Sequence, residues 1–288
     1  MTVCYAFFLT RRRRDFVRSM SISSTLVDRA DIRFHEAAGA LQPFVGCFWV
    51  VTAERGATIR VVPDGSTAIS IQLQNDEPAE WFLRGPLIRP DERRFTAAAI
   101  LVGIRLRPGV AFLLSGIHNH TIVGRRCRLS ELASFRDLVA EELRPVTPVT
   151  PERCIAVLQR FLLHRLERAT LHPTVVSAIR EVEREHGCVS VPDLAARCGV
   201  SPRHLHRLMR NWVGYGPKRY ANIIRFQATL HQMEDTPGRN GAALASANGF
   251  FDQAHLTLDL GRFAKTTPSR LASVGVADFF KSRCNDLP

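Results

Sequence analysis

A group of arginines at helical spacing is the feature of this sequence with the clearest chemistry. Arg203, His206, Arg207 and Arg210 fall on one face of a helix expected from about residue 202. A guanidinium can donate two parallel hydrogen bonds to O6 and N7 of guanine in the major groove, or it can bind a phosphate. This combination of residue types on one face is typical of a helix that contacts DNA.

The opposite face of the same segment is apolar, and its residues recur at i, i+3, i+4 and i+7: Leu205, Leu208, Met209 and Trp212. Such a stripe faces a core, which leaves the arginine face outward. Residues 194–233 also contain seven Lys and Arg but no Asp or Glu. Because a merely solvated surface usually mixes both signs of charge, the sequence favours a nucleic-acid contact over a solvated basic face.

Local signals predict how this helix is held. Ser190-Val-Pro-Asp193 starts a short helix as a variant of the capping box, and Gly199 ends it. Ser201-Pro202 then caps the arginine-bearing helix. Two short helices joined by a tight turn containing glycine form a helix-turn-helix unit. The N-terminal part of the second helix reaches base edges, so we expect Arg203, His206 and Arg207 at bases and Arg210 nearer the backbone.

The same pattern occurs a second time downstream. A linker helix is expected over about 218–233, and after a loop a short helix over 242–247. Asn248-Gly249 then forms a turn, and Asp252 caps a second candidate recognition helix over 253–260. A linker of about 17 residues spans roughly 25 Å. With its flanking turns it could place the two recognition helices about 34 Å apart, one turn of B-DNA.

Residues of about 172–272 resemble the DNA-binding domain of AraC/XylS-type transcriptional regulators. The resemblance lies in LAARCGVSPRHLHRLMRNWVGYGPKRY, in GFFDQAHLTLDLGRF and in the TTPSRL that follows. It implies base contacts at the recognition positions of both units, which are Arg203, His206, Arg207, Gln253, His255, Thr257 and Leu258. Contacts to the DNA backbone are expected from Ser201, Arg210, Lys218, Arg219 and Asn248.

The second unit departs from the family pattern at two positions. Leu258 stands where the family often has Arg, and Gly261 stands where a polar or basic residue is common. Gly also weakens a helix interior by roughly 1 kcal/mol relative to Ala. The second unit is therefore expected to read less sequence than the first, or to contact chiefly phosphates and thymine methyl groups.

The N-terminal half has the pattern of an antiparallel β domain. Apolar stretches at 59–62, 68–73 and 100–106 are separated by Gly- and Pro-containing turns, which predicts a small barrel or sandwich. Helices are expected at Leu129–Leu143 and, after a Pro/Thr linker, along an apolar stripe at 155–166. The stripe either caps the barrel or forms a dimer seam. This half resembles a regulatory domain found ahead of such DNA-binding domains, which implies effector sensing, dimerisation or both.

The predicted fold class is thus α+β. A small N-terminal β-barrel or sandwich with helices precedes an all-α domain of two helix-turn-helix units joined by a linker helix. The predicted organisation is a disordered tail (1–30), a regulatory domain (31–170), a DNA-binding domain (171–275) and a C-terminal tail (276–288). Translation could start at Met1 or at Met20.

Composition limits the remaining possibilities. The chain has 288 residues, 45% of them hydrophobic, and a formal net charge of +12. These values exclude a wholly disordered chain and a disulfide-stapled miniprotein. Seven scattered cysteines without a CxxC pair fit thiols in a reducing cytoplasm. No apolar run is long enough to span a membrane.

We expect a bacterial regulator rather than an enzyme, without cofactor or metal. No P-loop, nucleophile elbow or dinucleotide fingerprint is present. His118-Asn-His120 lacks the following Glu that a metal-binding barrel would supply. Expected partners are promoter DNA and RNA polymerase, with a small-molecule effector and a second copy of the chain left open. The alternatives are a regulator without an effector and an enzyme domain fused to a DNA-binding module.

Overall fold

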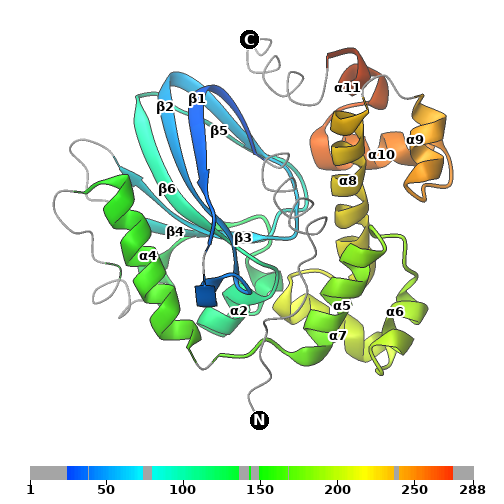
Figure 1. Cartoon of the computed structure of the whole chain (residues 1–288), viewed down its shortest axis with the longest axis horizontal. Coiled ribbons are helices and arrows are strands. Elements are labelled where there is room, and N and C mark those ends of the chain that lie inside the picture. The colour runs from blue at the N-terminus through cyan, green and yellow to red at the C-terminus, as the bar shows by residue number, and fades with distance from the viewer. Residues whose placement is uncertain are drawn as a thin grey trace.

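The computed structural model describes residues 25–37, 39–73, 80–135, 143, 149–167, 169–236 and 240–274. An antiparallel sheet occupies the N-terminal half and helices fill the C-terminal half, which confirms the predicted α+β class (Figure 1). The predicted tail over 276–288 and the arginine run at 11–14 lie outside the described residues. The predicted N-terminal boundary is too late, because the first strand already begins at Thr25.

The sheet has seven strands: β1 (Thr25–His35), β2 (Val45–Val61), β3 (Thr67–Leu73), β4 (Trp81–Arg84), β5 (Asp91–Arg94), β6 (Ala99–Leu106) and β7 (Arg126–Arg128). The strand order is β1-β2-β6-β3-β4-β7, and β5 pairs with β2 away from this path. Strand β2 pairs with β6 through its first half and with β5 through its second half. The short helices η1 (Gly39–Leu41), α2 (Val110–Ser115), η2 (Asn119–Thr121) and η3 (Leu129–Glu131) connect the strands.

One face of the sheet is covered by helix α4 (Pro151–Leu166), which forms the main core of this domain. The predicted apolar stripe of α4 is buried against the sheet, with Leu158, Phe161 and Leu162 at most 1% exposed. The stripe therefore caps the sheet and is not available as a dimer seam. The helix predicted at Leu129–Leu143 is wrong over its described first turns. That segment is η3 followed by turns up to residue 135, and residues 136–142 lie outside the described residues.

The other face is covered by the sheet itself. The second half of β2 folds over with β5, and a second cluster forms from apolar residues such as Val51, Ile59 and Leu101. Strands β5 and β3 are not paired, but the side chain of Arg93 in β5 donates a hydrogen bond to that of Gln72 in β3. The sheet thus curls over on itself into an open barrel, because no pairing among the described strands joins β1 to β7.

The C-terminal half contains α5 (Pro173–Arg184), α6 (Val191–Arg197), α7 (Pro202–Trp212), α8 (Pro217–Asp235), α9 (Gly241–Ala247), α10 (Gln253–Ala264) and α11 (Pro268–Val274). The expected caps are present at both units. Ser201 accepts a hydrogen bond from the backbone N–H of His204, and Asp252 accepts one from that of His255. The pairs α6–α7 and α9–α10 form two helix-turn-helix units on the linker helix α8 (Figure 1).

The first unit packs directly against the N-terminal domain. The hydroxyl of Tyr215 donates a hydrogen bond to Leu87 O at 2.7 Å. The side chain of Gln227 on α8 donates one to Pro63 O at 2.5 Å. These contacts join the segment that follows α7, and the linker helix itself, to loops of the barrel.

Five cysteines lie in the described part of the chain, and each is a thiol rather than half of a disulfide: Cys47, Cys127, Cys154, Cys188 and Cys198. Burial raises the pKa of the Cys154 thiol to about 11. Among the described residues, none of the helices combines the length and apolar character that crossing a bilayer requires.

Candidate nucleic-acid interface

Helix α7 presents the predicted basic face to solvent. Arg203, His206, Arg207 and Arg210 are all exposed, whereas Leu205 and Met209 are completely buried. The side chain of Arg207 lies 3.2 Å from Nδ1 of His204, one turn earlier. None of the three arginines is paired with a carboxylate among the described residues. Their charge is therefore available to an anionic partner.

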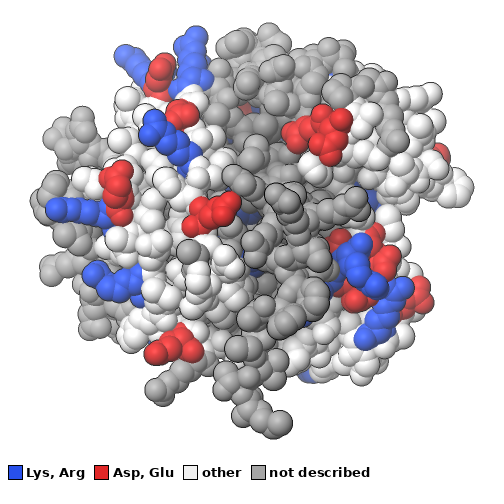
Figure 2. Space-filling model, viewed as in Figure 1, with Lys and Arg blue, Asp and Glu red and all other residues white. Residues whose placement is uncertain are grey.

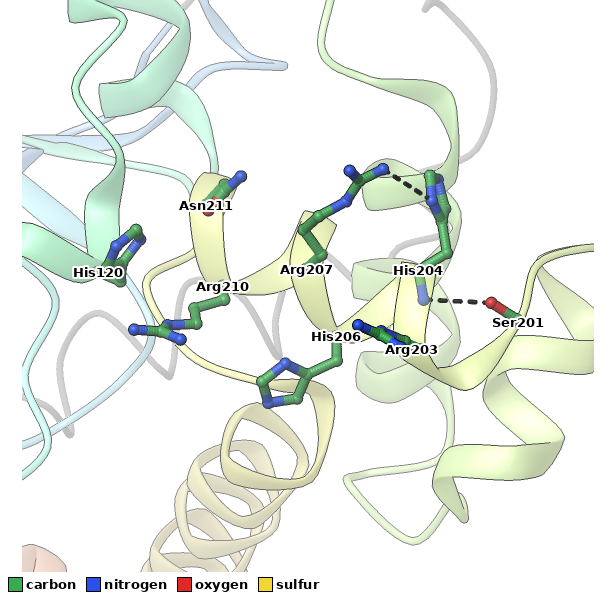
Figure 3. Close-up of a pocket in the computed structure, with 8 residues that line it drawn as sticks. All are labelled: His120, Ser201, Arg203, His204, His206, Arg207, Arg210 and Asn211. Atoms are coloured by element: carbon green, nitrogen blue, oxygen red, sulfur yellow. Dashed lines mark hydrogen bonds between the residues drawn. The ribbon is translucent and has the colours of Figure 1, made fainter.

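These side chains line a shallow hollow on the surface (Figure 3). The end of the hollow near the start of α7 is lined by Ser201, Arg203 and His204. The other end is lined by Arg210, which lies beside His120 of the N-terminal domain. Burial, the charge of Arg210 and the neighbouring His118 lower the pKa of His120. The barrel thus contributes one side chain to the edge of the basic face.

A second hollow joins the two units at the start of the linker helix. His206 of α7, Lys218 and Arg219 of α8 and Arg262 of α10 all line it. Lys218 and Arg219 are exposed, as expected for residues that contact the DNA backbone. The cations predicted in the first unit and at the linker therefore lie on neighbouring surfaces.

Two cations of residues 194–233, the stretch without Asp or Glu (the acid-free stretch), do not lie on the basic face of α7. Arg197 forms ion pairs with Glu181 and Glu185 of α5, at 3.1 and 2.9 Å. Arg225 is buried between α8 and the second unit, where it donates to Gly249 O at 3.2 Å. These two arginines belong to the internal structure of the domain rather than to its basic face.

Helix α10 presents a less polar surface than α7. Gln253 is exposed, Leu258 is 72% exposed, and the hydroxyl of Thr257 donates to Gln253 O at 2.8 Å. His255 is half-buried, and its ring lies edge-on to Phe250 with 5.3 Å between the centroids. Gln253 and Leu258 are therefore exposed, whereas Thr257 is half-buried and the ring of His255 lies against Phe250.

Asn248 lies inside the turn of the second unit. Its side-chain amide donates to Leu244 O at 2.8 Å and to Oε1 of Gln232 at 2.5 Å. The residue is only 8% exposed. A phosphate contact by this side chain would break both hydrogen bonds, so its position is that of a structural residue.

Three residues lie near the interface without having been predicted there. His120 reaches Arg210 from a distant part of the chain, and no local pattern marks such a contact. Asn211 completes the first hollow. Phe251, which precedes the cap of α10, is 93% exposed. The second Phe of the GFFDQ sequence is this residue, so the sequence could have indicated an aromatic side chain beside the second recognition helix.

The overall charge does not by itself point to this surface. Over the face shown in Figure 2, basic and acidic side chains are interspersed on both domains. The net charge of +12 is therefore a weaker indication than the unpaired arginines of α7.

Comparison with known proteins bears on both halves of the chain. A family described as a helix-turn-helix domain matches residues 194–273. The match covers both units and the linker helix between them, and the same segment carries the AraC-type motifs. Residues 194–273 are therefore a helix-turn-helix domain of the kind that AraC-type regulators carry. The AraC-type domain is preceded, at residues 33–128, by a match to a domain of unknown function, DUF6597.

Individual relatives of the AraC-type domain are more distant. An HTH-type transcriptional regulator of Mycobacterium tuberculosis, Rv1931c, is 37% identical over 67 residues, which are 23% of this chain. The chain spans about a quarter of that relative's length. A solved AraC-type regulator of Chromobacterium violaceum is 20% identical, with a TM-score of 0.32 and coverage of 40% and 96% of the two chains. ToxT of Vibrio cholerae is 9% identical, with a TM-score of 0.41 and coverage of 85% and 98%.

Proposed function

We propose that this protein is a sequence-specific DNA-binding transcription factor. The observation that carries the proposal is the exposed face of α7, where Arg203, Arg207 and Arg210 have no carboxylate partner among the described residues. A recognition helix with such a face fits the major groove, where Arg reads guanine.

The two units have different roles in this proposal. In the first unit, Arg203, His206 and Arg207 contact bases. In the second unit, Gln253 and Thr257 contact bases and Leu258 packs against a thymine methyl group. His255 supports the second unit from its half-buried position beside Phe250. The first unit supplies most of the sequence specificity because it carries the bidentate donors.

The DNA backbone is contacted from both sides of the α7 face. Ser201 is at the helix N-terminus, where backbone N–H groups favour a phosphate. Arg210, Lys218 and Arg219 supply positive charge near it. Asn248 is left out of this set because its side chain is bonded within the turn.

The N-terminal domain is proposed to control the DNA-binding domain in response to a ligand. The support is physical contact, since loops of the barrel bond Tyr215 and Gln227. A change in the barrel can therefore alter how the first unit is held. RNA polymerase and a second copy of the chain are the further partners of this proposal.

Selection of bound sequences from a random duplex library by the full chain tests the function. We expect enrichment of a site with two elements about one helical turn apart, and loss of the first element in Arg207→Ala. Arg160→Ala is the matched control, because it removes one exposed arginine from α4, far from the interface in sequence. Binding without enrichment of any sequence would contradict the proposal.

A further inference from the structure

The face of the sheet opposite the core under α4 carries arginines that the proposed DNA contact does not use. Arg84 of β4 lies directly opposite Arg126 of β7 in the sheet. Trp81 and Leu83 of β4 face the core under α4, so the alternation of strand side chains puts Phe82 and Arg84 on the other face. The guanidinium of Arg126 lies 3.6 Å from the centroid of the Phe82 ring.

A third guanidinium approaches the same face from β5, which folds over it. Arg93 donates to Gln72 of β3, and the positive charge of Arg93 lowers the pKa of Arg126. Asp91 is the acidic residue whose charge acts on all three arginines. No ion pair within 4.0 Å is formed by any of the three with a described residue. Asp64 acts in addition on Arg84, and Glu80 acts on Arg126, so carboxylates face the three cations without holding any of them in an ion pair.

This arrangement is unfavourable for the protein alone. Like charges directly opposite each other on neighbouring strands destabilise a sheet. The Nη1 atom of Arg84 is buried and has no hydrogen-bond acceptor, which adds a desolvation cost. Burial and the charge of Arg93 lower the pKa of Arg126 to about 10. An anion between these side chains would remove all three penalties.

We propose that Arg84, Arg93 and Arg126 form a binding site for the carboxylate or phosphate group of a small molecule, with Phe82 beside it. Arginine suits this role because its planar fork matches both groups in a bidentate manner. The proposal gives the chemical class of the ligand that the N-terminal domain is proposed to sense, and in this respect it rests on the proposed function.

The site lies next to the contact with the DNA-binding domain. Gly85 follows Arg84, and its backbone is so close to Ile122 that an added Cβ would lie 1.8 Å from the Ile122 carbonyl oxygen. The next two residues, Pro86 and Leu87, contact Gly214 and Tyr215 of the first helix-turn-helix unit. Drawing β4 and β7 together around an anion would therefore shift the surface on which α7 is seated.

Thermal unfolding of the full chain without DNA tests the site. The probes are inorganic phosphate and benzoate, each compared with sodium chloride at equal ionic strength. At about ten times the dissociation constant, a ligand of the native state is expected to raise the midpoint by about 2–5 °C. Arg126→Gln should abolish this rise, while its unliganded midpoint should equal or exceed that of the wild type. Arg125→Gln, an exposed neighbour with the same loss of charge, should retain the rise.

The basic face of α7 could also bind phosphate, so a second variant separates the two surfaces. The double variant Arg203→Gln/Arg207→Gln should keep the anion-induced rise. A response to phosphate alone assigns the site to phosphate-bearing ligands, and a response to benzoate assigns it to carboxylates. The proposal is overturned if neither probe raises the midpoint, or if Arg126→Gln responds as the wild type does. Failure here leaves the DNA-binding test untouched, because no DNA is present.

Discussion

Two arginines of the same acid-free stretch should respond in opposite ways to removal of their charge. Arg225 is buried, and Arg210 is exposed on α7. We expect Arg225→Gln to lower the stability of the DNA-binding domain while leaving the electrostatic part of DNA binding unchanged. We expect Arg210→Gln to weaken DNA binding while leaving stability within about 0.5 kcal/mol of the wild type.

The size of the effect at Arg225 follows from its contacts. The guanidinium donates to Gly249 O, pairs with Asp259 at 3.5 Å and lies 4.5 Å from the Phe250 ring centroid. Its removal leaves Asp259, whose side chain is 6% exposed, with Arg262 at 4.0 Å as its remaining cation. Breaking a buried pair from one side costs about 3–5 kcal/mol, and the residual partner reduces this to about 2–4 kcal/mol.

The effect at Arg210 follows from counterion release. Each phosphate contact contributes about −0.9 to the slope of log K against log salt concentration. The salt slope for a labelled random-sequence duplex, measured by fluorescence anisotropy, should therefore fall in magnitude by about 0.9 in Arg210→Gln. Urea unfolding of the same samples gives the stability, and the midpoint of Arg225→Gln should drop by about 1 M or more. The reasoning is refuted if Arg225→Gln reduces the salt slope by one contact and keeps its urea midpoint.

Three further predictions concern other parts of the molecule. Arg207→Ala should cost about 1–3 kcal/mol of affinity for the selected site, and more than Thr257→Ala, in a titration at fixed salt; equal losses would contradict the asymmetry between the units. Gly85→Ala should destabilise the barrel by more than about 2 kcal/mol in urea, because the new methyl group would overlap the Ile122 carbonyl; an unchanged midpoint would show that the strands separate freely. Although burial opposes ionisation, neighbouring guanidinium groups lower the pKa of Asp64 below its usual value. The ionised carboxylate therefore stabilises the fold above about pH 4, and this contribution is lost as the pH falls further. The unfolding midpoint of Asp64→Asn should depend less on pH in that range than the midpoint of the wild type.

The helix-turn-helix units could be predicted almost completely because their signals are local. Caps, a turn glycine and the 3.6-residue period all act within a few residues, and the structure has Ser201 and Asp252 as caps. The interpretation of charge was less accurate for a physical reason. The acid-free stretch is free of acids only along the chain. In space, Arg197 and Arg225 find Glu181 and Asp259.

The features that could not be predicted depend on distant segments. No sequence pattern shows that Arg84 and Arg126 are opposite each other, since 41 residues separate them along the chain. The helix expected at Leu129–Leu143 had suitable periodicity, yet the described start of that segment is a 3₁₀ turn, with Leu129 packed in the barrel core. Tertiary packing overrides local propensity at such a site.

The contacts between the domains explain why ligand control would act on the first unit before the second. The barrel holds Tyr215 just beyond the end of α7, and it holds Gln227 in the middle of α8. The N-terminal end of α7, with the side chains that are proposed to contact bases, remains exposed. Helix α8 in turn holds the second unit through Arg225. Under the proposed function, a shift at the barrel loops would therefore turn α7 directly, and it would reach α10 only through helix α8.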